Sequence, residues 1–334
     1  MEHGHTVFEW GLLVVIYLYT AGISAGMFAT SAFATYVGGG RYRRIARLGA
    51  LLAPWPLALG LGMLVLDLGR PLYFWKLFVT IQPTSPMSIG SWLLSLFMLV
   101  AMINLILWLP RPWRNLIKFP HSRADVRDRL RWQPLTARMV RMGRGVVAAI
   151  GFPLSLGVAM YTGILLGAIP GRPFWNTPML AQLFLFSAMS TGVAALLLVA
   201  ALWGRISDPH ELAHERHMLV SMDVVLILME FFIIIPFFLH QALNTRSSAE
   251  SLNLVMGGPY TALLWGGVIS LGLLLPLLIE GYELYPVALK EGAVKYNRLL
   301  GGLSGLLVLI GGFLLRYVFV YAGQLSHFLP VLPR

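Results

Sequence analysis

The chain of 334 residues contains no cysteine, and only 12% of its residues are charged. The lack of cysteine excludes an iron–sulfur cluster, a thiolate metal site or a disulfide of its own, because each of these needs cysteine sulfur. The first ten residues lack a basic segment, so we expect no cleaved signal peptide. Apolar residues make up 57% of the chain. This composition is typical of a polytopic helical membrane protein.

Eight apolar segments recur along the chain, and each approaches or exceeds the ~20 residues that a membrane-spanning helix needs. They predict an all-α protein with eight transmembrane helices. Prolines inside the second and seventh segments predict kinks there. The segments are Trp10–Val37, Leu48–Leu66, Met87–Leu109, Val146–Ile169, Pro178–Trp203, Met218–Leu239, Tyr260–Ile279 and Leu299–Tyr321.

Basic residues concentrate in alternate loops, which the positive-inside rule assigns to the cytoplasm. Both termini and the loop after Asp67 are therefore predicted to be periplasmic. The net charge of +11 then reflects basic loops beside anionic lipid rather than nucleic-acid binding. We expect residues 1–110 with 144–169 to form a first four-helix bundle, and 178–323 a second. The basic connection 110–144 between them is predicted to be a cytoplasmic interfacial segment.

Three ionisable residues fall inside the apolar segments, where charge is costly and usually functional. Asp223 and Glu230 are seven residues apart, which places them on one face of a helix. Arg316 lies in the eighth segment. These groups predict a proton route or charges poised by a redox site. The alternative is an ion pair of Arg316 with Glu230 that only holds helices together. Glu280 and Glu283 are predicted to lie at a solvated helix end, with a proton entrance as the alternative.

Several polar groups share one depth near the periplasmic side. Tyr17 and Tyr161 each lie seven residues inside their segments, which is roughly 10 Å below the surface at 1.5 Å per residue. Arg316 reaches a similar depth, and Asp67 lies at or just under the surface from which these depths are counted. A single buried tyrosine is usually a packing residue. Convergence of several polar groups predicts a site instead.

Two sets of histidines could suggest a metal or haem site, but neither set is typical of one. The stretch His210–His214 matches the HExxH pattern of zinc proteases. However, Asp208 and Pro209 before it are typical of a helix start, so we interpret it as a capping box. Haem would need two axial ligands, and only His240 and His327 lie near membrane ends on one side. We expect neither zinc nor haem.

Five motifs resemble the NrfD/PsrC family, the membrane subunits of bacterial respiratory oxidoreductases that include polysulfide reductase. The resemblance covers most of the chain. It implies eight helices, no haem, and a quinone site on the periplasmic side beside a ferredoxin-like four-cluster iron–sulfur subunit. The motifs are YLYTAGISAG at 17–26, LDLGRP at 66–71, PTSPMSIGSW at 83–92, YTG at 161–163 and PFWNTP at 173–178.

The resemblance also implies roles for individual residues. Tyr17, Asp67 and Tyr161 resemble the quinone-site residues of the family, and they are the predicted catalytic groups. We expect Arg70, Ser88 and Trp92 to complete the quinone-binding set. Asp223, Glu230 and Arg316 resemble the other polar positions that the family requires, and they form the predicted proton path. Ser85 and Pro86 predict the start of the third helix, with its N–H groups facing Asp67.

A chain without cysteine or haem ligands cannot carry electrons across the bilayer alone, but it can hold a lipid-soluble carrier. We therefore expect a membrane anchor that binds menaquinone or ubiquinone in the bacterial inner membrane. Its expected partners are the iron–sulfur subunit, a molybdopterin or multihaem catalytic subunit, and membrane lipid. The alternative is a proton-coupled secondary transporter that uses the charges at mid-membrane.

Overall fold

The structure is a computed structural model, and it describes residues 10–37, 40–68, 71–79, 82–109, 126–203, 209–288 and 298–328. Within these ranges it is built from helices and turns, and eight helical spans are long and apolar enough to cross a membrane. The predicted all-α class and the eight spans are thus confirmed. The helices are α1 (Leu12–Val37), α2 (Arg43–Leu52), α3 (Pro54–Asp67), η1 (Pro71–Tyr73), α4 (Lys76–Val79), α5 (Pro86–Trp108), α7 (Val126–Gly167), α8 (Met179–Trp203), α9 (Pro209–Leu243), α10 (Arg246–Met256), η3 (Leu263–Leu274), α11 (Leu275–Ala288) and α12 (Arg298–Leu325).

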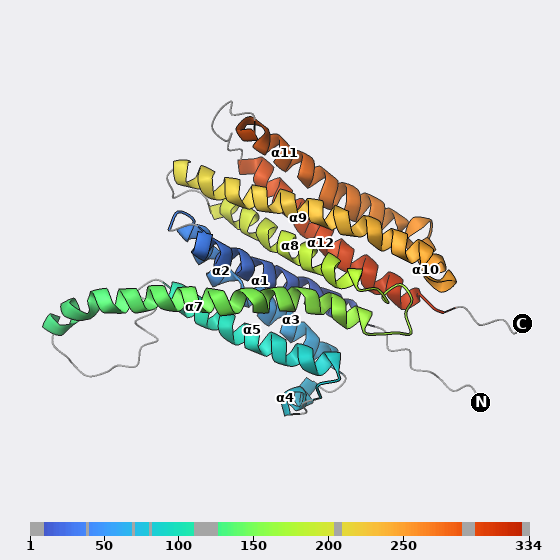
Figure 1. Cartoon of the computed structure of the whole chain (residues 1–334), viewed down its shortest axis with the longest axis horizontal. Coiled ribbons are helices and arrows are strands. Elements are labelled where there is room, and N and C mark those ends of the chain that lie inside the picture. Colours follow the sequence, from blue (N-terminus) through green and yellow to red (C-terminus); the bar gives the residue numbers. More distant parts are fainter. Residues whose placement is uncertain are drawn as a thin grey trace, which may run out of the picture.

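Two helices, α1 and α8, form the centre of the molecule. α1 packs against α2, α3, α7, α8 and α12, and α8 packs against α1, α7, α9 and α12. Helices of the first half therefore lie on one side of this pair and helices of the second half on the other (Figure 1). The division into two four-helix bundles stays a prediction, because α1 and α7 both pack directly on α8.

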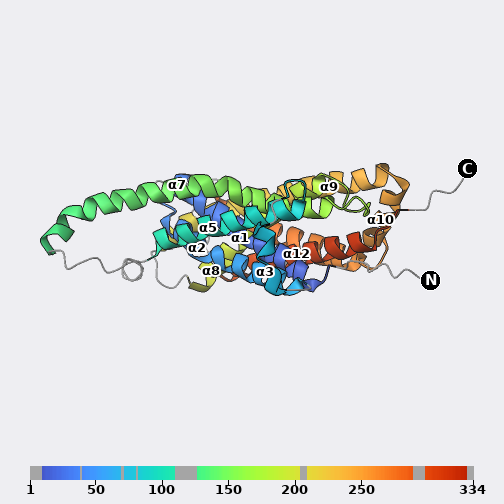
Figure 2. The ribbon, with the colours of Figure 1, turned by 90° about the horizontal axis from the view of Figure 1, so that it is seen from below.

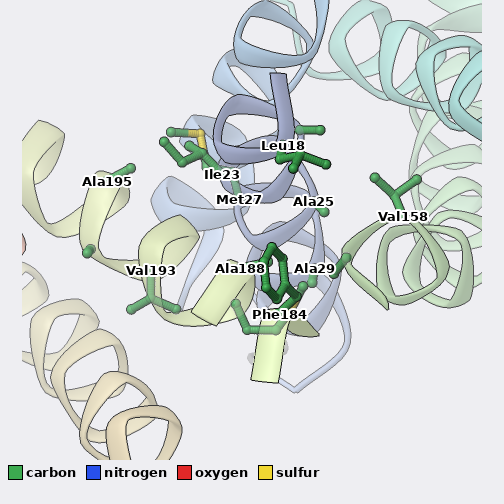
Figure 3. Packing of buried hydrophobic residues seen from close by; sticks show 14 of the residues in the cluster. Leu18, Ile23, Ala25, Met27, Ala29, Val158, Phe184, Ala188, Val193 and Ala195 are labelled. Carbon is green, nitrogen blue, oxygen red and sulfur yellow. The ribbon is translucent and has the colours of Figure 1, made fainter. Parts of the chain in front are cut away.

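Small residues explain why α1 and α8 can be so deeply buried. A Cβ atom on Gly26 would collide with the backbone of Ala188 and Gly192, and one on Gly192 would collide with Gly26. The two helices thus meet backbone to backbone, which is a common way for membrane helices to associate. Figure 3 shows small buried residues of both helices in this region, among them Ala25 and Ala29 of α1 and Ala188 of α8.

Prolines lie at a helix break in the second span and beside a change of helix type in the seventh, while the predicted kinks there stay predictions. Ala53 separates α2 from α3, and Pro54 is the first residue of α3. In the seventh span, η3 is a π-helix of 12 residues that gives way to α11 at Leu275. Pro276 follows at once, and its missing N–H removes one backbone donor at this transition. Long π-helical stretches are rare, and they often occur near functional sites.

The helix α7 is longer than a membrane crossing requires. Its 42 residues span roughly 63 Å at 1.5 Å per residue, against ~30 Å of hydrocarbon. It extends well beyond the other helices at one end of the molecule (Figure 2). Part of the predicted interfacial connection, from Val126 onward, is therefore continuous with the fourth span, whereas residues 110–125 lie outside the described part.

The two ends of the helix assembly are named here by residues that lie near them. At the Asp67 end, α1 begins and α3 and α12 end. At the Arg216 end, α1 ends and α12 begins. At the Asp67 end, hydrogen bonds join the start of the first span to the end of the last. The Trp10 backbone N–H donates to the Gln324 side chain at 2.8 Å. The Gln324 side chain donates back to the Trp10 carbonyl at 3.0 Å, and Trp10 stacks on Trp175.

Candidate functional site

Two predicted tyrosines lie near each other inside the first half of the molecule. Tyr17 of α1 is 1% exposed and Tyr161 of α7 is 6% exposed, and the two side chains are near enough to interact electrostatically. Two glycines make room for them. Gly60 of α3 lies against the Tyr17 backbone, and the Tyr161 ring lies directly over Gly90 of α5. Four helices thus converge on a pair of neutral phenols.

Asp67 lies nearer the surface than the tyrosines. It is the last residue of α3 and is exposed, seven residues beyond Gly60 and hence roughly 10 Å further along the helix. Its carboxylate lies beside the start of α1, where Oδ1 is 3.8 Å from the Cβ position of Gly11. The positive end of the α1 dipole favours a carboxylate there.

The start of α5 is at the predicted residue, but its capping differs. Pro86 is the first residue of the helix, whereas the Ser85 side chain makes no capping hydrogen bond. Instead the Ser88 hydroxyl accepts a hydrogen bond from the Gln82 N–H at 3.1 Å. Trp92 is 45% exposed on the outside of the helix. Arg70, the remaining predicted pocket residue, lies outside the described residues.

A second polar group occupies the other half of the molecule, centred on Arg316. This guanidinium is fully buried and donates from Nη1 to the Gly312 carbonyl at 2.7 Å and to the Ser187 hydroxyl at 3.1 Å. It lies 5.6 Å from the Phe184 ring centroid and 5.7 Å from that of Tyr19. Its Nη2 faces Gly22 of α1. Arg316 thus reaches from α12 to the central pair of helices.

The two predicted acidic residues of α9 lie along this same group. Glu230 interacts electrostatically with Arg316, and the Ser187 hydroxyl hydrogen-bonds to its carboxyl group. Ser187 thus lies between the arginine and the glutamate. Asp223, two turns away, accepts a hydrogen bond from Ser190 at 2.6 Å. The structure therefore brings Asp223, Glu230 and Arg316 into one continuous buried polar region.

The prediction that Glu280 and Glu283 lie at a solvated helix end was wrong. They are 1% and 4% exposed. Glu283 forms a bidentate ion pair with Arg216 of α9, and Glu280 accepts a hydrogen bond from Ser304 of α12 at 2.6 Å. The apolar segment does end next to these glutamates, as predicted. However, α9 and α12 pack against both side chains and shield them from solvent.

Sequence reasoning missed the partners of these charges. Ser187 and Ser190 lie three residues apart on α8 and face the charged side chains of α9 and α12. Their small hydroxyls look like ordinary packing residues in an apolar segment. The ion pair of Arg216 with Glu283 had a weak signal in the sequence, because the two opposite charges lie near the same end of their predicted helices. No three His, Cys, Asp or Glu residues in the described ranges are grouped to hold a metal ion.

The protein is thus a multi-pass membrane protein. It has two buried tyrosines in one half and a buried polar region with Asp223, Glu230 and Arg316 in the other. A family model described as "Polysulphide reductase, NrfD" matches residues 1–327. The chain belongs to this family, as its motifs predicted.

Relatives of known name are similar over nearly the whole chain. The chain is 31% identical to Protein NrfD of Escherichia coli (strain K12), with 95% of each protein covered. It is 32% identical to the C chain of polysulfide reductase from Wolinella succinogenes, and the match covers 97% of this protein and 96% of the relative. It is 25% identical to the C subunit of selenate reductase from Mesobacillus selenatarsenatis, where the match covers 96% of this protein and 75% of the relative.

Proposed function

We propose that the chain is the quinone-binding membrane subunit of a respiratory oxidoreductase of the bacterial inner membrane. Family membership, and relatives named as subunits of polysulfide and selenate reductases, support the coarser statement that it is a membrane subunit of such a complex. The chain itself has no cysteine. Electrons therefore pass between a bound quinone and a partner's redox group, for which a ferredoxin-like iron–sulfur subunit beside a molybdopterin or multihaem catalytic subunit is the expected choice.

The observation that carries this proposal is the buried pair Tyr17–Tyr161 beneath the exposed Asp67. Phenol hydroxyls donate hydrogen bonds without carrying charge, which suits the carbonyl oxygens of a neutral, lipid-soluble quinone. Asp67, at the surface, exchanges protons with water as quinol is oxidised or quinone is reduced. In this arrangement the tyrosines orient the head group, and the Asp67 end of the molecule is periplasmic.

Quinone type is open between menaquinone and ubiquinone, and both present two ring carbonyls to the site. The buried charges of α9 and α12 serve a proton path toward the quinone level. The alternative of a proton-coupled transporter uses the same charges but needs neither the tyrosine pair nor a redox partner. The arrangement of Tyr17, Tyr161 and Asp67 in one half therefore favours the quinone function.

The test is photolabelling of the purified complex with an azidoquinone, followed by quinol-linked turnover in variants. We expect label on α1, α3, α5 or α7 near Tyr161, and reduced labelling in Tyr161→Phe. Tyr36→Phe is the matched control, because it also removes a tyrosine hydroxyl, which donates from α1 to the Gly145 carbonyl of α7, far from the site. Label confined to the Arg216 end, or equal labelling in Tyr161→Phe and the wild type, would contradict the proposal.

A further inference from the structure

Two buried carboxyl groups on different helices, Asp223 of α9 and Glu280 of α11, form a pair. They are 0% and 1% exposed. Each has one oxygen held by a serine hydroxyl, since Ser190 donates to Asp223 Oδ1 and Ser304 donates to Glu280 Oε1, both at 2.6 Å. The helices that supply these four residues are neighbours in the second half of the molecule (Figure 1).

The second oxygen of each carboxyl has no hydrogen-bond donor among the described residues. Asp223 Oδ2 and Glu280 Oε2 are both buried and unpartnered in this sense, and the two carboxyl groups interact directly with each other. Two ionised carboxylates in such contact repel strongly, and an oxygen buried without a donor is costly. One proton placed between the two oxygens removes both costs at once.

The neighbouring charges leave no cation in the described part of the chain to compensate this pair. Arg216 is engaged by Glu283, and Arg316 interacts with Glu230 and Ser187. The charged groups that face the pair are themselves acidic: Glu230 on the same helix as Asp223, and Glu283 one turn beyond Glu280. Facing residues from α8 and α12 are the neutral Ser190 and Ser304. Two full negative charges here would be uncompensated in an apolar interior.

We propose that Asp223 and Glu280 share one proton between Oδ2 and Oε2, so that the pair is a proton-holding site with one negative charge. The pair lies between the Arg216–Glu283 ion pair and Glu230. A proton that arrives at Glu280 from the Arg216 end displaces the shared proton to Asp223, and Asp223 releases one toward Glu230. One proton enters and one leaves, so the charge of the pair is restored and no redox partner is needed.

The access side of this site is also present in the structure. A small cleft, partly open to the outside, is lined mainly by apolar residues of α2, α8 and α9 and reaches Glu215 and Arg216. Water in this cleft would bring protons to the Arg216–Glu283 pair. The claim that the proton moves during turnover rests on the proposed quinone function. The claim that the pair holds a proton is independent of that function.

Infrared spectroscopy of the purified complex tests the proton directly. We expect the wild type at neutral pH to show a protonated-carboxyl carbonyl band that shifts in D₂O, and Glu280→Gln and Asp223→Asn each to remove it. The amide of Glu280→Gln still donates to Asp223, so this variant should assemble. Ser304→Ala keeps both carboxyls and should shift the band because the hydrogen bond to Oε1 is lost. Glu250→Gln, at an exposed carboxylate, should leave it unchanged.

The outcomes separate this inference from the quinone function. A wild type without the band, a band that survives both Glu280→Gln and Asp223→Asn, or a band unshifted in Ser304→Ala would overturn the shared proton. A band that emerges only when sodium is removed would also overturn it, because the four oxygens would then hold Na⁺. If the proton is mobile, Glu280→Gln should lower turnover on the order of 100-fold while azidoquinone labelling stays at the wild-type level. Absent labelling in a wild type that retains the band would instead refute only the quinone function.

Discussion

The two halves of the molecule place polar groups in the membrane in opposite ways. In the first half, Tyr17 and Tyr161 are buried but uncharged, and the carboxylate of the predicted site, Asp67, is at the surface. In the second half, charged side chains such as Arg316 and Glu230 are buried completely and are matched to one another. An uncharged donor without a partner costs less in an apolar interior than a charge without one, so donors can be left for an incoming neutral molecule more readily than charges can. The first arrangement suits a ligand, and the second suits protons.

The largest effect should come from removing a buried cation of the second half. Arg316→Met leaves Glu230 without its charge partner and should destabilise the protein by about 3–5 kcal/mol, measured as a lower midpoint of thermal unfolding in detergent. Adding Glu230→Gln should recover much of this loss, because the double variant buries no unmatched charge. A double variant no more stable than Arg316→Met would show that Glu230 does not compensate the arginine.

Removing the surface carboxylate of the first half should act on activity rather than stability. Asp67→Asn keeps the shape of the side chain but cannot accept a proton, so quinol-linked turnover should fall about 100-fold. Its unfolding midpoint should stay within a degree or so of the wild type, because the group is exposed. A large fall in the midpoint would place Asp67 with the structural charges of the second half instead.

Packing around the tyrosine pair gives an intermediate test. Gly90→Ala places a methyl group where the Tyr161 ring lies, and overpacking of this kind costs about 1–3 kcal/mol. The displaced ring should weaken azidoquinone labelling and quinol turnover together. Gly62→Ala on α3 is the matched control, because a Cβ there meets open space. Equal effects of the two substitutions would mean that Tyr161 has no defined place in the site.

The smallest effect should come from an ion pair that water surrounds. Arg246 and Glu250 are 3.9 Å apart on α10 with largely exposed side chains. Exposed pairs of this kind contribute about 0.3–0.5 kcal/mol, so Arg246→Ala should change the unfolding midpoint very little. The buried pair of Arg216 and Glu283 is the informative contrast, and Arg216→Ala should cost several kcal/mol. Comparable losses in both variants would contradict the burial of the second.

Much of the fold could be predicted because a bilayer leaves few choices to a long apolar segment. The eight spans follow from segment length and composition. The common depth of Tyr17 and Tyr161 follows from helical rise alone, and their nearness then needs only that α1 and α7 pack together. Pro54 likewise marks its helix start without reference to any neighbouring helix.

The failures arise where side chains depend on neighbours that the sequence does not reveal. Glu280 and Glu283 lie near the end of their apolar segment, and linear depth alone suggests water around them. They are buried because α9 and α12 cover them with Arg216 and Ser304. The π-helix of the seventh span carries no recognisable local signal either, although Pro276 marks its end.

The contact of Gly26 with Gly192 has a mechanical consequence. No side chain lies between the two backbones, so this interface has no compressible layer to absorb displacement. Tyr17 is carried by one of these helices, and Ser187 and Ser190 by the other. We therefore expect that a small shift of α1, if a ligand occupies the tyrosine site, would also move the hydroxyls that hold Arg316 and Asp223. The glycine contact would in this way couple ligand binding in one half of the molecule to hydrogen bonding in the other.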